Sequence, residues 1–422
     1  MVELENWKIF TIENLTKIFT KQTGFDYTAY IKPTLTREYK KGYIPFIQNK
    51  DFNGKFINYE TDYYIPSNIA TDFPRILLNE KCLLVSISGS VGNVAVFNNL
   101  KTAFIGGAIA IGKFKDKELL DWCMYYLMSR EGQSKLLGNV KAGSHQNLIL
   151  DDLRKIEIPI PPKEKQKAIV KALSDTDELI NSLEKLIAKK EAIKQGTMQQ
   201  LLTGKKRLAG FSREWEEKRL GDVIVKFQNG FAFNAQGYIK DGIPIVTMAQ
   251  IGLDGTFKFD TNKVNYWSLE ESKNLKDFYL NNGDVIIAMT DVTPEKNLIG
   301  RMTIVNTSTT CLLNQRVGHL ILDEKQINSL FLTTLSNMKK WRTYSIGIAS
   351  LGVQANIGTK DILNGVIRLP SIKEQNAISQ ILSDMDNEIE SLKSKLSKTK
   401  AIKDGMMSEL LTGKTRLLKE QI

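Results

Sequence analysis

Hydrophobic residues recur every three or four positions in two long stretches of this chain, and the spacing predicts two long helices. The first stretch runs from Ile169 to Leu201 and the second from Ile378 to Leu410. Near-alternating steps of three and four place the apolar residues on one narrow stripe, which is typical of a coiled-coil seam. Ile193 and Ile402 also fall on the two stripes. The residues expected to pack in the seam are Ile169, Leu173, Ile180, Leu183, Ile187, Leu201, Ile378, Leu382, Met385, Ile389, Leu392, Leu396, Met406 and Leu410.

Proline and glycine mark the ends of both predicted helices. Pro161 and Pro370 come just before the stripes, and Gly204 and Gly413 follow them. Proline is tolerated at a helix start, and glycine adopts the left-handed backbone that often ends a helix. We therefore expect a central helix within residues 163–208 and a C-terminal helix within 372–422, each about 60 Å long at about 1.5 Å per residue.

The two helical stretches are copies of each other. At a constant offset of 209, residues 161–208 and 370–417 are identical at 24 of 48 positions. A helix with such a stripe needs a partner to bury it, and the same chain supplies a second one. We predict that the two helices pack antiparallel. The alternative is that each helix covers only its own neighbouring domain.

A globular domain precedes each helix, at residues 1–162 and 209–371. Short strand-like runs punctuated by Gly and Asn occur in both, followed by a helix, a loop and a last strand. The offset of 209 continues back through Asn147 and Asn356, and before that the halves agree only in outline. The prediction is an α+β protein with two mixed α/β domains, two long helices and a pseudo-twofold internal repeat. The helix has stayed similar while the domain has diverged, as expected if the domains read different targets.

Composition indicates a soluble protein with a polyanionic partner. Net charge is +11, and residues 163–207 alone carry eleven Lys and Arg against six Asp and Glu. Charge by itself does not separate a nucleic-acid surface from a solvated helix face. Three distant cysteines fit a reducing cytoplasm. The start of the chain lacks the pattern of a signal peptide, and the longest apolar run, near 104–112, is too short to cross a bilayer.

The sequence contains no motif for catalysis or metal binding. Only His145 and His319 are present, and neither belongs to a ligand cluster. The stretch GAIAIGKF resembles a phosphate-binding loop, but Phe114 stands where a Ser or Thr would hold Mg²⁺, and its apolar residues indicate a buried strand. Pro161 and Pro162 lack the Asn or Asp and the aromatic residue of an amino-methyltransferase motif. We expect no enzyme activity, no metal and no cofactor in this chain.

The order of the elements resembles the specificity subunit of Type I DNA restriction-modification enzymes. The motifs that carry the resemblance are IPIPPKEKQKAI with LSDTDELI, LPSIKEQNAI with LSDMDNEI, and the closing QQLLTGKKRL and SELLTGKTRL. They cover both repeats in order, with mild departures at Arg368 and Ser371. The resemblance implies a non-catalytic subunit with two target-recognition domains, each reading half of a split, asymmetric DNA site. It also implies that the helices set the half-site spacing and dock two methylation subunits, which use S-adenosylmethionine. ATP-driven restriction subunits would join them, with Mg²⁺.

Loop residues are the candidates for DNA contact, because Arg, Asn and Gln pair with base edges while Lys, Ser and Thr reach phosphates. The candidates are Lys21, Gln22, Ser88, Ser90, Asn93, Ser144, His145, Gln146, Asn229, Asn234, Thr290, Arg301, Arg316, Gln354 and Asn356. Turn or cap roles for Asn147 and Asn356 and carboxylate pairing for Arg301 and Arg316 compete with this interpretation. Two other functions remain open: a self-contained DNA adenine methyltransferase, and a bridging protein without sequence preference.

Overall fold

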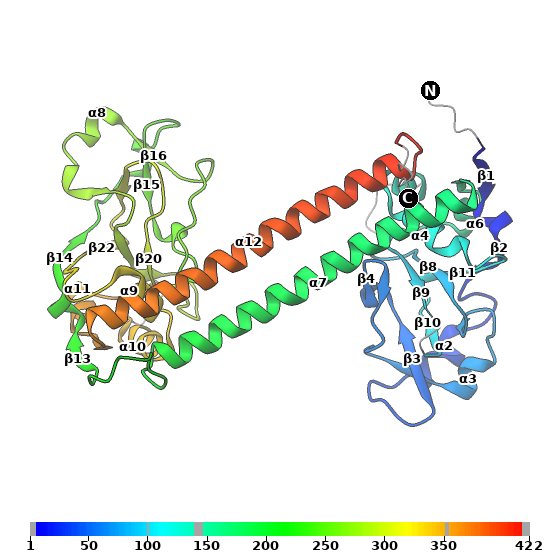
Figure 1. Cartoon of the computed structure of the whole chain (residues 1–422), viewed down its shortest axis with the longest axis horizontal. Helices are drawn as coiled ribbons and strands as arrows, with labels where there is room; N and C mark the ends of the chain where they lie inside the picture. The colour runs from blue at the N-terminus through cyan, green and yellow to red at the C-terminus, as the bar shows by residue number, and fades with distance from the viewer. Residues whose placement is uncertain (1–5, 99–100, 139–146, 351–353, 416–422) are drawn as a thin grey trace. The chain divides into compact units, whose positions relative to one another are not determined.

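The computed structural model describes residues 6–98, 101–138, 147–350 and 354–415. The chain divides into two compact units, one formed by Met1–Lys185 with Lys393–Ile422 and the other by Leu186–Leu392. Each unit holds one globular domain together with parts of both long helices (Figure 1). Two mixed α/β domains and two long helices are therefore present, as the sequence predicts.

The first domain is built from two four-stranded sheets. The strands of the first sheet lie in the order β2-β11-β8-β9, all antiparallel, and those of the second in the order β6-β3-β10-β7, in which β3 and β10 are parallel. Strands β1 and β12 form a separate antiparallel pair. The strands are β1 (Lys8–Thr11), β2 (Thr16–Lys21), β3 (Tyr43–Ile47), β4 (Phe52–Asn53), β5 (Phe56–Ile57), β6 (Tyr64–Pro66), β7 (Leu77–Leu78), β8 (Cys82–Ser86), β9 (Val94–Phe97), β10 (Ala103–Ile105), β11 (Ile109–Phe114) and β12 (Glu157–Ile160). The helices are α1 (Ile12–Leu15), α2 (Tyr27–Tyr30), α3 (Ser67–Thr71), α4 (Leu119–Met128), α5 (Arg130–Leu137) and α6 (Leu150–Arg154).

The second domain repeats the strand order of both four-stranded sheets and the separate antiparallel pair, while the β4–β5 hairpin of the first domain has no counterpart among its described residues. Its sheets have the orders β14-β22-β18-β20 and β16-β15-β21-β17, again with one parallel pair, β15 with β21, and β13 pairs with β24. The strands are β13 (Glu216–Arg219), β14 (Ile224–Asn229), β15 (Ile243–Val246), β16 (Tyr266–Trp267), β17 (Tyr279–Leu280), β18 (Val285–Ala288), β19 (Thr290–Asp291), β20 (Met302–Ile304), β21 (Cys311–Leu313), β22 (Val317–Leu322), β23 (Ala355–Asn356) and β24 (Val366–Leu369). The helices are α8 (Leu269–Ser272), α9 (Ser329–Leu335), α10 (Lys339–Ile348) and α11 (Thr359–Asn364). The duplication thus includes both sheets of the domain.

In each domain a pair of helices covers the sheet β2-β11-β8-β9 or its counterpart β14-β22-β18-β20, which we call the main sheet. The sequence predicted one helix at this place. In the first domain the break falls at Ser129, whose hydroxyl accepts a hydrogen bond from Gly132 N at 3.1 Å and so caps α5. Gly132 is required there because a Cβ would overlap the carbonyl oxygen of Tyr126. The side chains of Trp122, Tyr125 and Tyr126 on α4 are buried in the core.

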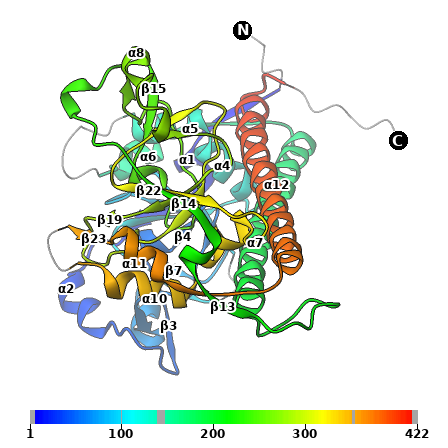
Figure 2. The same ribbon diagram turned by 90° about the vertical axis from the view of Figure 1, so that its left-hand side faces the viewer.

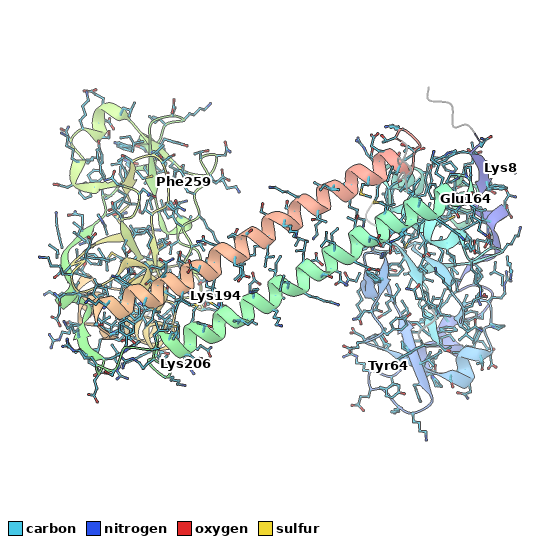
Figure 3. All side chains as sticks on the ribbon, viewed as in Figure 1. Lys8, Tyr64, Glu164, Lys194, Lys206 and Phe259 are labelled. Atoms are coloured by element: carbon cyan, nitrogen blue, oxygen red, sulfur yellow. The ribbon has the colours of Figure 1, made fainter. Side chains whose placement is uncertain are left out.

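The long helices are α7 (Lys163–Leu201) and α12 (Ile372–Leu410). They run antiparallel within each unit. In the first unit Asp177 pairs with Lys403 and Glu184 with Lys400, so the number of the partner falls as that on α7 rises. In the second unit Lys194, labelled in Figure 3, pairs with Asp386. Lys190 pairs with Glu388 in the same sense.

The expected seam residues differ in their burial. Those that are buried are Ile169, Leu173, Leu183, Ile187, Leu201, Ile378, Leu382, Ile389 and Leu410. Those that are half-buried are Ile180, Met385, Leu392, Leu396 and Met406. By contrast Ile193 and Ile402 are 45% and 60% exposed, while Met198 and Met407 are buried. A helix of 3.6 residues per turn drifts away from a strict 3.5-residue repeat, so the positions that face inward change along a stripe of this length.

Candidate nucleic-acid interface

Three chain segments meet at one end of the main sheet in each domain. In the first domain Ile87 N donates to Ala108 O at 2.8 Å, and Leu148 N donates to Ile87 O at 2.9 Å. Ser88 is bridged to Asn147 beside them. We call Ser88, Ala108 and Asn147, with the residues next to them, the strand-end surface of this domain.

The second domain has the same strand-end surface, formed around Thr290, Arg316 and Asn356. Met289 N donates to Arg316 O at 3.0 Å, and Ile357 N donates to Met289 O at 2.9 Å. Thr290 pairs with Asn356 between β19 and β23, which are labelled next to each other in Figure 2. The backbone hydrogen bonds match those of the first domain one for one, which makes Ala108 and Arg316 equivalent positions.

The strand-end surface of the first domain borders a hollow. Its volume is about 350 Å³, and it is lined by Gln22, Phe25, Tyr27, Phe46, Gln48 and Gly106–Ala108. Gln22 Nε2 donates to Ile105 O at 2.6 Å, which fixes its carboxamide at the rim. Lys21 precedes it at the end of β2, opposite Ala110 of β11. Two carboxamides and three aromatic rings therefore line a space that is open to a planar polar group.

Other candidates of the first domain lie in the turn between β8 and β9. Ser90 and Asn93 are exposed. Asn93 N donates to Ser86 Oγ at 2.8 Å, and that hydroxyl donates to Ser90 O at 2.7 Å, so the turn is ordered by its own hydrogen bonds. Ser144, His145 and Gln146 lie outside the described residues.

Arg316 is the exposed cation of the second strand-end surface. Its backbone N–H donates to Asn314 Oδ1 at 3.2 Å, which fixes the turn between β21 and β22. Its guanidinium forms no ion pair or hydrogen bond with any residue that the structure describes. A guanidinium held on an ordered turn and left without a partner is suited to a phosphate or a guanine edge.

The neighbours of Arg316 are mostly committed to local contacts. The Thr290 side chain is buried, with its hydroxyl against Met248 Sδ. Asn356 is exposed, and its Nδ2 donates to the carbonyl of half-buried Gln354 at 3.1 Å. Asn229 Oδ1 accepts a hydrogen bond from Thr359 Oγ1 at 3.1 Å. These residues gather at one end of the domain, although they are far apart in sequence.

Two candidates of the second domain have structural partners. Asn234 caps a short 3-10 helix, since its Oδ1 accepts from Gln236 N at 3.1 Å. Arg301 Nε donates to Asn297 O at 2.6 Å, and its Nη1 donates to Asn337 Oδ1. Burial lowers the pKa of Arg301 from its usual value, although the charge of Asp254 opposes this.

Asp291 and Arg342 lie beneath the strand-end surface of the second domain and were not predicted from the sequence. Asp291 Oδ1 accepts from Thr293 N at 2.8 Å, and Arg342 Nη2 donates to the carbonyls of Lys296 and Asn297 at 3.0 Å each. Asp-x-Thr is a turn-forming pattern that signals the role of Asp291. A buried arginine inside a helix has no comparable local signal.

The described residues offer no metal centre or reactive thiol. No group of three His, Cys, Asp or Glu within the described ranges is placed to hold a metal ion. Cys82, Cys123 and Cys311 are buried, and burial raises the pKa of Cys82 to about 12 and that of Cys311 to about 11. Thiols this far from ionisation are poor nucleophiles. None of the helices described is both long enough and apolar enough to pass through a membrane.

Relatives of known type match the chain along almost its whole length. It is 26% identical over 412 residues to the Type I restriction enzyme MjaVIII specificity subunit of Methanocaldococcus jannaschii, covering 93% of this chain and 92% of that protein. Its fold is similar to the S subunit of a Type I restriction-modification system from M. genitalium, with a TM-score of 0.56, 18% identity and 96% of each chain covered. A chain from a structure on complex assembly and conformational transition of the type I R-M system gives a TM-score of 0.58, with 15% identity and coverage of 96% of this chain and 97% of that one.

The family model for the Type I restriction modification DNA specificity domain matches the chain twice, at residues 4–195 and 212–400. Each match takes in one globular domain and most of the long helix that follows it. The chain belongs to the family of DNA specificity subunits of Type I restriction-modification systems, and is a recognition component of such a system, not a catalytic one.

Proposed function

We propose that the two domains read the two unlike halves of one split DNA site through their strand-end surfaces. The observation that carries this proposal is that two domains with the same sheet topology present different side chains at equivalent turns. Gly106, Gly107 and Ala108 stand in the first domain where Asn314, Gln315 and Arg316 stand in the second. The shared fold supports one way of docking on DNA, and the different side chains support two different sequences.

The candidate contact residues follow from this proposal. In the first domain they are Lys21, Gln22, Ser88, Ser90, Asn93, Ser144, His145 and Gln146. In the second they are Asn229, Asn234, Thr290, Arg301, Arg316, Gln354 and Asn356. Arg316 and the carboxamides around the hollow are suited to base edges, whereas Lys21 and the serines are suited to phosphates.

The long helices would fix the spacing of the half-sites and dock two methylation subunits. A protein with a pseudo-twofold repeat matches the symmetry of the DNA backbone when its two recognition domains contact the same face of the duplex. Their half-sites are then about one helical turn, or about 10–10.5 base pairs, apart. In this proposal S-adenosylmethionine binds the methylation subunits, and ATP with Mg²⁺ binds the restriction subunits. The complex works in the cytoplasm, where it meets the DNA.

An exchange of domains tests the proposal. Residues 209–371 would be replaced by the corresponding domain of a relative, the chain would be purified with its methylation subunit, and methylated sites would be mapped by sequencing. We expect one half-site to change while the other half-site and the spacing are kept. A complex that methylates without any sequence preference would favour a simple bridging role. Methylation by the chain alone would contradict its assignment as a non-catalytic component.

A further inference from the structure

The turn between β18 and β20 is much longer than its counterpart between β8 and β9, although both are closed in the same way. Gly92 N donates to Ser86 O at 2.9 Å, and Gly300 N donates to Ala288 O at 2.8 Å. Both glycines have left-handed backbones, with φ of 87° and 74°. The first turn needs only residues 87–91 to reach its glycine, whereas the second uses residues 289–299. The extra length is therefore not required to form the hairpin.

A buried carboxylate holds the first part of the longer turn. Asp291 is 3% exposed. Its Oδ1 accepts from Thr293 N and Thr293 Oγ1, both at 2.8 Å, and its Oδ2 accepts from Leu298 N. One side chain thus ties together the backbone amides of Thr293 and Leu298, which are five residues apart.

Two guanidinium groups hold the second part. Arg342 on α10 is 9% exposed and donates to the carbonyls of Lys296, Asn297 and Ile299. Arg301 donates to Asn297 O as well. Trp341 Nε1, next to Arg342, donates to Gly300 O at 2.7 Å. The backbone carbonyl groups in this part of the turn therefore point inward, where they accept hydrogen bonds from the side chains of Arg342, Arg301 and Trp341.

The longer turn is held by buried charges, although burying a charge usually lowers stability. An isolated buried charge is strongly unfavourable, and here the two arginines are also close enough to repel each other. The shorter turn of the first domain, with Gln133 Nε2 on Gly92 O at 2.8 Å, forms without a buried ion. A segment that is not needed for the hairpin, but is held rigid by buried charges, is the kind of segment that must be ordered before it binds.

The outer side of the turn is exposed and adjoins the strand-end surface. Val292 is 62% exposed, and residues 293–295 are also exposed. Lys296 has a left-handed backbone, with φ of 50°, which is uncommon for a residue other than glycine and is often found at functional sites. The first two residues of the turn belong to the strand-end surface: Met289 N donates to Arg316 O, and Thr290 pairs with Asn356.

We propose that residues 292–300, the clamped loop, enter a groove of duplex DNA as a base-reading element of the second domain, with Asp291 and Arg342 as the positioning residues that hold it. This rests on the proposed function. An exposed valine suits the methyl group of thymine, and the carboxylate of Glu295 suits the amino group of cytosine. The adjacent free guanidinium of Arg316 would bind the backbone or a guanine. The first domain, with its short turn and open hollow, reads its half-site differently.

A loop exchange in the complex with the methylation subunit provides the main test. Residues 289–299 would be replaced by Ile-Ser-Gly-Ser-Val, the sequence of residues 87–91, and methylated sites would be mapped by sequencing. We expect the half-site read by the first domain to be unchanged, and discrimination at one or more base pairs of the other half-site to fall about 10-fold or more. An unchanged motif in both half-sites would overturn the proposal.

Single substitutions keep the test decisive if the exchange disturbs folding. Val292→Ala and Glu295→Gln change only exposed side chains, and Val225→Ala and Glu324→Gln are matched exposed controls in the same domain. We expect relaxed discrimination for the first pair and an unchanged motif for the controls. Equal motifs in all four variants would refute the loop's role.

Arg342→Lys and Arg342→Met test the positioning role. A purely structural arginine would lower the melting temperature while leaving the methylation motif intact, and that result would count against the proposal. We expect Arg342→Met to relax the same base pairs as the loop variants, and Arg342→Lys to recover part of the discrimination. If the wild-type complex shows no sequence preference, the proposed function itself fails. If the wild type keeps a split motif that the loop variants share, only this inference fails.

Discussion

Lys403 Nζ on α12 lies 2.7 Å from Asp177 Oδ1 on α7, and the same pair recurs 209 residues away as Lys194 and Asp386. The two pairs have different surroundings. Asp177 also accepts from Tyr125 OH at 2.7 Å and lies 3.1 Å from Lys55 Nζ, so the first domain is attached to both helices through one carboxylate. The side chain of Asp386 is half exposed and, among the residues that the structure describes, is bound by Lys194 without a tyrosine or second lysine.

Asp177→Ala should lower the free energy of unfolding by about 3 kcal/mol, because it removes the counter-charge of Lys403 and Lys55, whose side chains are only 15% and 11% exposed. Asp386→Ala should cost less than about 1 kcal/mol, as for exposed ion pairs. Urea denaturation of both variants checks the difference. Equal losses would show that the attachment of the first domain contributes nothing.

The same carboxylate predicts a dependence on pH. Burial acts to raise the pKa of Asp177, but hydrogen bonds from Lys403 and Tyr125 and the charges of Lys403 and Lys55 outweigh it and hold the pKa below its usual value. A lowered folded-state pKa stabilises the fold above the usual value of about 4, and that contribution is lost as the pH falls through the folded-state value. The stability difference between wild type and Asp177→Ala should therefore stay constant from about pH 7 to 5 and shrink below about pH 4. A difference that grows in acid would contradict this.

Arg207 and Glu374 form a two-pronged ion pair in the second unit, with both N–O distances at 2.7 Å. The glutamate side chain is 2% exposed and the arginine side chain 26%. Arg207→Met should therefore cost about 3 kcal/mol, because it leaves a buried carboxylate without a partner. Adding Glu374→Met should restore much of that loss, since the charge is then removed. A double variant whose loss equals the sum of the two single losses would argue against coupling.

Gly300→Ala should destabilise the protein more than Gly92→Ala. Both positions have left-handed backbones, so each substitution carries a strain of about 1–2 kcal/mol. A Cβ at Gly300 would also clash with the Ser345 side chain, whereas a Cβ at Gly92 would lie 3.0 Å from Gln133 Oε1 and 3.1 Å from Leu137 Cδ2, contacts that shifts of a few tenths of an ångström relieve. Thermal melting of the two variants gives the comparison. A larger loss for Gly92→Ala would be inconsistent with the packing described.

Arg316→Gln should weaken binding of the complex to its cognate duplex about 10-fold at fixed salt concentration. Arg368→Gln is the control, because Arg368 is an exposed arginine on β24 of the same domain. Fluorescence anisotropy with a cognate duplex and a duplex altered in one half-site would show whether discrimination falls with affinity. An equal loss on both duplexes would make Arg316 a phosphate contact and not a base reader.

The long helices could be predicted because their stripe is a local, repeated pattern. Details of the seam were less accessible: Asp177 is not among the residues expected in the seam, yet it is buried, and a buried carboxylate is stable there only because Tyr125, Lys55 and Lys403 are brought to it. Pairing across distant parts of the chain leaves no trace in hydrophobic periodicity. The helix break at Ser129 was missed because a capping residue inside an apolar run looks like any other polar position. The start of α10 was missed because Met338, which precedes it, forms no side-chain capping hydrogen bond and so gives no signal.

The candidate site was predictable only in part for the same reason. Thr290, Arg316 and Asn356 were identified as loop residues, but their convergence depends on sheet pairings between segments up to 66 residues apart. In the sequence, the shared topology of the two domains could be recognised in detail only from Asn147 and Asn356 onward. The earlier strands agree only in outline, since strands tolerate many apolar sequences. Arg342 and Asp291 gain their role from burial and from the carbonyls and amides around them, which only the folded chain reveals.

The far ends of the two long helices have a consequence for how the protein arose. Met198 and Leu201 of α7, with Leu202 just after it, belong to the core cluster of the second domain, and Met407 and Leu410 of α12, with Leu411 just after it, to that of the first. Each repeat therefore closes the core of the other, as in a domain-swapped dimer whose two copies have been fused. A single repeat would lack part of its core, and two copies of it would have to pair to complete both cores. If the two domains read different half-sites, as we propose, joining both repeats in one chain lets the two halves of the target differ.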